Sequence, residues 1–198
     1  MTVHEVIPAP QSHREARAVA DAMKRAVHTG RASRAALAFE RAVSQEIING
    51  LGNVSVATAA EILSGLRTEV GRDAVTLVAL GLDWKAAAYD TERSGQAHLN
   101  RVFDMVDPLR PTVDHDLALQ VITHLCGVAP DDVRHVVLAQ GAFLAWFLQR
   151  RDLAIAFLNR AIEANPEAMT EYRLGAVVHQ DAAPGYAHAA RTATAAVN

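Results

Sequence analysis

The sequence has one cysteine, two lysines and few aromatic residues, and each shortage excludes a class of protein. A single cysteine, Cys126, cannot form an internal disulfide bond, so a disulfide-stapled secreted scaffold is excluded. Aromatic residues make up 5% of the 198 residues, which disfavours a sheet because aromatic side chains are enriched in strands. No apolar run approaches the roughly 18 residues of a membrane span, and residues 1–10 lack the pattern of a signal peptide. We therefore expect a cytoplasmic protein that does not contact a membrane.

The chain also lacks an excess of positive charge. Its formal net charge is −3, so no bulk electrostatic attraction to nucleic acid is expected. The basic residues are 17 arginines and only two lysines, Lys24 and Lys85. Because the arginines are unevenly distributed along the chain, a local basic face is still compatible with the negative net charge.

Alanine is abundant, with 39 residues, and it is the best helix former. No alternation of apolar and polar residues continues beyond the first seven positions, so the sequence predicts an all-α fold. We expect a compact bundle of about eight or nine helices, with a Thr58 and Glu61 capping box as the clearest start signal. Pro130 is expected at the first position of its helix, and Asp152 is expected to cap another. The expected helices cover approximately residues 12–30, 33–49, 58–70, 73–80, 84–106, 114–126, 130–149, 152–164 and 168–179.

Proline and glycine positions suggest how the chain is organised. Residues 1–11 read as an extended arm, because Pro8 and Pro10 exclude a helix there. The arm either pairs with a partner or is disordered. Residues 12–184 are predicted to form a single helical domain, with residues 107–112 as a candidate boundary between subdomains, and residues 185–198 form an alanine-rich tail.

Residues 142–166 have the pattern of a helical hairpin. Small residues at Ala142, Ala154 and Ala161 and a terminating Pro166 follow the spacing of a tetratricopeptide unit, so this segment resembles one such hairpin. Only one unit is recognisable, and a repeat array is therefore not expected.

The same segment more closely resembles the C-terminal part of an actinobacterial family catalogued as domain of unknown function 4192. The pattern comprises Ala-Phe-Leu-Ala-Trp at residues 142–146, an alanine-rich helix and the Asn165–Pro166 pair, and the resemblance extends over roughly residues 70–184. Residues 1–60 look different from the additional N-terminal portion of that family. The resemblance implies an actinobacterial or actinophage origin but no activity, because none is established for the family.

Candidate catalytic and metal-binding patterns are weak. His115 and His124 are nine residues apart, and no pair of cysteines or histidines has the spacing of metal ligands. Cys126 lies in an apolar run, where a buried structural thiol is expected rather than a nucleophile. We therefore predict no catalytic residue, metal or cofactor, and an enzyme with an unrecognised site is the second alternative.

Aromatic residues in the hairpin region favour a protein-binding function. Phe143, Trp146, Phe147 and Tyr172 are of the types that anchor protein interfaces. Trp146 and Phe147 are successive and cannot face the same direction on a helix, so one is expected in the core and the other in a groove. The favoured interpretation is a non-catalytic module that binds and modulates a host or cellular protein, and self-association into a homo-oligomer is a further option.

Nucleic-acid binding is the first alternative, and it depends on three arginines. Arg31, Arg34 and Arg41 lie in one predicted helix, and Arg34 and Arg41 share a face because they are seven residues apart. Such a face can contact phosphates. Glu40 and Glu46 interleave with these arginines, so a solvated helix face is the simpler interpretation.

Overall fold

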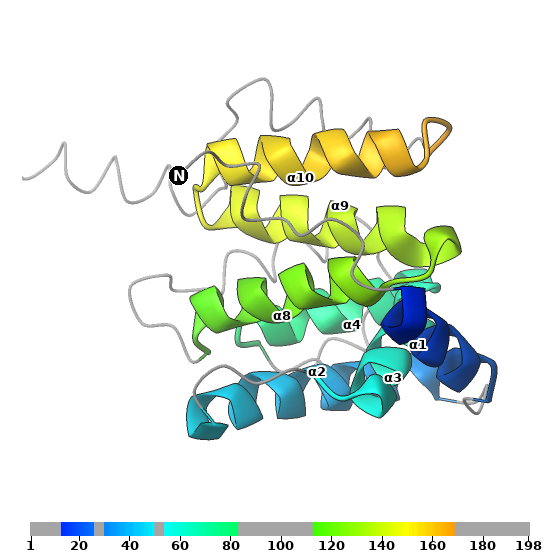
Figure 1. Cartoon of the computed structure of the whole chain (residues 1–198). Coiled ribbons are helices and arrows are strands. Elements are labelled where there is room, and N and C mark those ends of the chain that lie inside the picture. Colours follow the sequence, from blue (N-terminus) through cyan, green and yellow to red (C-terminus); the bar gives the residue numbers. More distant parts are fainter. Residues whose placement is uncertain (1–12, 26–29, 50–53, 83–112, 169–198) are drawn as a thin grey trace, which may run out of the picture.

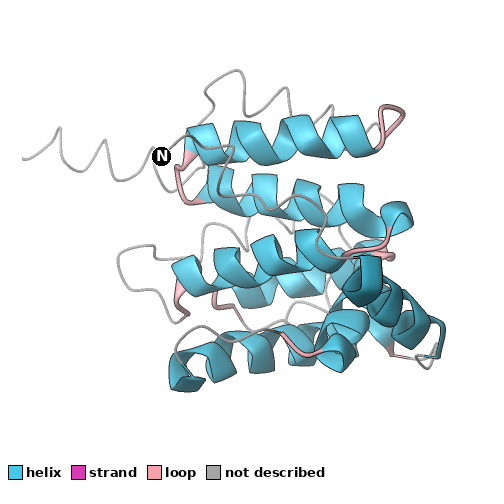
Figure 2. Ribbon diagram, in the orientation of Figure 1, coloured by secondary structure: helices cyan, strands magenta, loops and turns pink. Residues whose placement is uncertain are grey.

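The structure is a computed structural model that describes residues 13–25, 30–49, 54–82 and 113–168. Helices dominate these residues and no strand occurs among them, which confirms the all-α prediction for the described part of the chain (Figure 1, Figure 2). The predicted arm, the helices at 84–106 and beyond residue 168, the candidate boundary and the tail lie outside these residues. The seven described helices are α1 (His13–Arg25), α2 (Arg31–Asn49), α3 (Val56–Leu66), α4 (Glu69–Ala79), α8 (His115–Val128), α9 (Asp131–Phe147) and α10 (Arg151–Ala164).

The helices pack as two connected groups around one core. α8, α9 and α10 lie side by side in this order, with α9 in the middle (Figure 1). α2 packs against α3 and α4, and α1 packs mainly on α3. α4 and α9 run in the same direction, because Arg67 before α4 pairs with Asp132 at the start of α9, and Thr76 donates a 2.7 Å hydrogen bond to Gln140 further along.

The α9–α10 hairpin is closely packed. Its four small residues Ala142, Ala145, Ala154 and Ala161 are all fully buried. A Cβ atom at Gly141 would lie 2.8 Å from the ring of Phe157, so glycine is needed where these helices approach. Between the helices, Gln149 adopts a left-handed conformation with φ of 58°, and the Arg150 amide donates to the Ala145 carbonyl.

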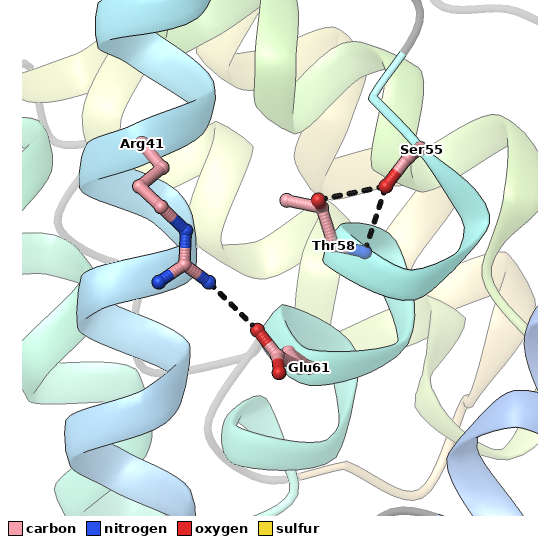
Figure 3. Close-up of polar contacts among 4 residues, drawn as sticks. All are labelled: Arg41, Ser55, Thr58 and Glu61. Carbon is pink, nitrogen blue, oxygen red and sulfur yellow. Dashed lines mark hydrogen bonds and ion pairs between the residues drawn. The ribbon is translucent and has the colours of Figure 1, made fainter.

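The start of α3 differs from the prediction. The helix begins at Val56 rather than at Thr58, and Ser55 is its N-cap. The Ser55 hydroxyl accepts a 3.1 Å hydrogen bond from the Thr58 amide, which satisfies one of the amides that a helix start leaves without a partner (Figure 3). The predicted capping box is therefore wrong, and Glu61 is directed to a different contact.

The end of α3 also differs from the prediction. A single helix was expected over residues 58–70, but α3 ends at Leu66 and α4 begins at Glu69. Thr68 causes this break, since its hydroxyl donates to the Gly65 carbonyl at 2.9 Å and accepts from the Gly71 amide at 3.1 Å. Gly71 therefore lies inside α4 and is not a helix stop.

Several smaller corrections concern the other helices. α8 continues through Gly127 to Val128, and Pro130 is the N-cap of α9 rather than its first residue. Asp152 lies in the first turn of α10 and does not cap it, because the N-cap position falls on Arg150.

Candidate functional site

The aromatic residues singled out in α9 divide between the core and the surface. Phe147 is 1% exposed and belongs to the core, whereas Phe143 and Trp146 are half-buried. The ring centroids of Phe143 and Trp146 are 5.7 Å apart with planes inclined at 52°, and those of Phe143 and Phe147 are 6.4 Å apart. The structure thus decides which of the two successive aromatics is internal. Tyr172 lies outside the described residues.

Phe143 lies where α9 meets α4 and α8. It borders a cavity of about 10 Å³, which is no larger than the space for one water molecule. The other residues around this cavity are Val75, Thr76, Ala79, Ile122, Gln140 and Leu144. Phe143 therefore borders a small cavity at the junction of α4, α8 and α9, and this cavity is too small for an organic ligand.

Charged residues surround the neighbouring end of α8. Asp114 caps α8 by accepting hydrogen bonds from the amides of Asp116 and Leu117 at 2.9 and 3.1 Å. Arg150, which follows α9, forms an ion pair with Asp116. Burial lowers the pKa of His115, although a hydrogen bond to the Leu80 backbone and the nearby carboxylates act in the opposite direction. This end of the molecule joins α4, α8 and α9 through polar contacts.

The three arginines on which the nucleic-acid alternative depends make different contacts and do not share one role. Arg41 donates a 2.9 Å hydrogen bond to Glu61 and so connects α2 with α3 (Figure 3). Both side chains are substantially exposed, and such pairs contribute on the order of 0–1 kcal/mol to stability. Arg31 and Arg34, in contrast, line a pocket with Arg25.

This arginine pocket lies between α1, α2 and α3 and has a volume of about 280 Å³. Its lining residues are Ala22, Arg25, Arg31, Arg34, Ala57, Ala60, Glu61 and Ser64. The three-residue spacing of Arg31 and Arg34 was visible in the sequence. Ser64 carried no sequence signal, because it reaches the pocket only through the packing of α3 on α2.

Cys126 is buried, as the sequence predicts. Burial raises the pKa of its thiol to about 12. The thiol is therefore protonated at neutral pH, whereas a thiolate is the reactive form of cysteine.

Comparisons of the whole chain with family models, with curated proteins and with solved structures found no match. Within the described ranges, no group of three potential metal-ligating side chains comes together. None of the described helices is long and apolar enough to cross a membrane.

Proposed function

We propose that this protein is a non-catalytic binding module that recognises a partner protein through Phe143 and Trp146. The observation that carries the proposal is the position of this pair. Both rings are half-buried at the end of α9, and Phe143 joins Trp146 to the core residue Phe147. Trp146 is thus partly exposed, and it packs against the hydrophobic core.

Aromatic side chains suit this role for two physical reasons. Tryptophan buries a large area on binding and loses little conformational entropy, since it has only two rotatable side-chain bonds. Interface energy is commonly concentrated in a few such residues. Here α9 packs against α8 on one side and α10 on the other, so little of the helix needs to become ordered on binding.

The proposal includes the likeness of the α9–α10 hairpin to a tetratricopeptide unit and kinship to the actinobacterial family named above. Both rest on the sequence pattern of residues 70–184. Under this proposal the partner is a protein of an actinobacterial cell, and the module modulates that protein by binding.

Capture from an actinobacterial lysate tests the proposal. The tagged full chain is compared with Trp146→Ala and with the matched control Val70→Ala. Val70 is 52% exposed on α4, so its substitution removes apolar surface elsewhere. We expect the native chain and the control to retain the same partner at about 0.3 M salt, where exposed charge pairs are strongly screened. Trp146→Ala should reduce capture at least tenfold, since loss of an interface hot spot costs about 2 kcal/mol or more.

Circular dichroism and thermal melting establish that each variant is folded. Equal capture by the native chain and a folded Trp146→Ala variant would contradict the proposal. The nucleic-acid alternative would replace it if no partner is retained and the chain binds random duplex DNA with a steep salt dependence that Arg31→Gln and Arg34→Gln reduce.

A further inference from the structure

His115 is the first residue of α8, and its side chain connects this helix with the end of α4. The ring forms a hydrogen bond with the backbone of Leu80, the C-cap residue of α4. This bond acts to raise the pKa of His115, as donation to a carbonyl oxygen does, so the Leu80 carbonyl is the acceptor. The Nε2 atom of the ring is buried and has no hydrogen-bond partner. Nδ1 is therefore the donor, and Nε2 of the neutral ring carries only an electron pair.

The conformation at the end of α4 explains why the Leu80 carbonyl needs this donor. Gly81 has a φ of 76°, and the amides of Gly81 and Leu82 donate to carbonyls in the last turn of α4 at 2.9 and 2.8 Å. This arrangement is a Schellman motif, which satisfies carbonyls further back in the helix but not the carbonyl of the C-cap residue. Leu80 is 2% exposed, so its backbone is shielded from water. His115 thus supplies the donor that a buried helix end requires.

The charged side chains that act on this ring, among the residues that the structure describes, are two carboxylates and one guanidinium group. Asp114 and Asp116 flank the ring in α8 and favour its protonated form, whereas Arg150 in the turn after α9 disfavours it. Asp116 forms an ion pair with Arg150, and Asp114 accepts the amides of Asp116 and Leu117. Neither carboxylate contacts Nε2. From α4, the ring meets the backbone of the C-cap residue.

A proton on Nε2 would have no acceptor while the ring stays in this position. Protonation converts Nε2 into a donor and places a full charge at the N-terminus of α8, where the helix dipole is also positive. Burial is the largest cause that acts on the ring, and the pKa of His115 is lowered. A conformation in which the ring reaches water therefore binds the proton more strongly than the closed one. By linkage, a decrease in pH shifts the population toward that open conformation.

We propose that His115 is a pH-sensitive switch, and that its protonation separates the start of α8 from the end of α4 while the other described helices stay packed. The separation is local because the rest of α8 is held by residues in the core, among them Leu119, Ile122 and Leu125. Helix ends also open at a lower free energy than helices of the core do. The proposal is independent of the protein-binding function, which uses Trp146.

Amide hydrogen exchange of the full chain, resolved by residue with NMR at about pH 7.5 and about pH 5.0, tests this inference. The amide of Leu82 reports on the end of α4, and that of Ala118 reports on the first turn of α8, where it donates to the Asp114 carbonyl. After correction for intrinsic exchange rates, the opening equilibrium at both amides should rise at least about threefold at the lower pH. One histidine with an ordinary pKa of about 6.5 that is protonated only in the open state limits the rise to about thirtyfold. Amides in the middle of α10 should change less than about twofold, because the opening is local.

His115→Gln removes the titrating group, while the glutamine amide can still donate to the Leu80 carbonyl. This variant should lose the pH dependence at both amides. His124→Gln is the matched control, because His124 also lies in α8 and its Nε2 is likewise buried without a hydrogen-bond partner. It should keep the pH dependence of the native chain. Circular dichroism establishes that each variant is folded.

Nitrogen-15 NMR of the ring in the native chain supplies a second measurement that needs no variant. We expect the neutral ring of His115 to carry its proton on Nδ1, and its titration midpoint to lie below about 6.5. A proton on Nε2 of the neutral ring, or a midpoint at or above 6.5, would overturn the inference. Unchanged opening at Leu82 and Ala118, an equal rise in α10, or the same pH dependence in His115→Gln would overturn it as well.

Discussion

Replacing Gly65 by alanine should destabilise the protein by forcing α2 and α3 apart. A Cβ atom at residue 65 would lie 2.2 Å from the Cβ of Ala35 and 3.0 Å from the carbonyl oxygen of Arg31. Ordinary contact starts at 3.4 Å, so the two Cβ atoms must separate by at least 1.2 Å (from 2.2 to 3.4 Å). Overpacking of this kind costs about 1–3 kcal/mol, against a gain of about 1 kcal/mol when alanine replaces glycine in a helix.

The net of these two terms is a fall of up to about 2 kcal/mol in the free energy of unfolding of Gly65→Ala, and no rise is expected. A chain of this size should lose roughly 2–4 °C in Tm per kcal/mol. The paired variant Ala35→Gly supplies the control. In the double variant the Cβ atom of residue 65 no longer meets that of residue 35, and the nearest atoms of residue 35 are at 3.6 Å.

Urea denaturation followed by circular dichroism measures all four species of this double-mutant cycle. The double variant should be more stable than the sum of the single effects predicts, with a coupling energy of about 1 kcal/mol or more. An increase in stability for Gly65→Ala alone, or strictly additive effects, would refute the close approach of α2 and α3.

Three further predictions concern a cap, a histidine and the cysteine. Ser55→Ala should lower the free energy of unfolding by about 1 kcal/mol in urea titrations, and Thr58→Ala by less, because Ser55 caps α3; the reverse order would contradict this assignment. The pKa of His115 is lowered by burial from its ordinary value of about 6.5, so the unfolded chain binds the proton more readily. The contribution of His115 to the free energy of unfolding should therefore be fully present above about pH 6.5 and should be lost as the pH decreases below that value. The His115→Gln variant should show a shallower loss of stability across the same pH range. Cys126, with its pKa raised to about 12, should react with iodoacetamide at pH 8 only at the rate of unfolding, and rapid alkylation of the native protein would contradict its burial.

Helix positions were predictable because they depend on local signals. The apolar spacing and the turn residues predicted a helix in each described segment, but they missed the break between α3 and α4. Their ends were less predictable where two hydroxyl residues compete. Ser55 and Thr58 both precede apolar residues, and only the structure shows that Ser55 caps α3 while Glu61 pairs with Arg41 of α2. A tertiary ion pair has no local signature in one sequence.

The orientation of individual side chains shows the same limit. Within α2 the apolar residue Leu37 is 37% exposed, whereas Phe39 is fully buried. The arginine pocket depends on packing in the same way. Arg31 and Arg34 are visible as neighbours on one helix, but Ser64 joins them only because α3 packs on α2. Contacts between residues thirty or more positions apart depend on how the helices pack, and the apolar periodicity of one sequence does not determine that packing.

Hydrogen–deuterium exchange on the complex captured from the lysate tests the central claim most directly. The claim is that the partner protein covers the surface around Phe143 and Trp146. The proposed function predicts slower exchange in the C-terminal half of α9 and in the turn before α10, with little change in α1 and the first turn of α2. Slower exchange confined to α1, α2 or α3, with α9 unchanged, would contradict it.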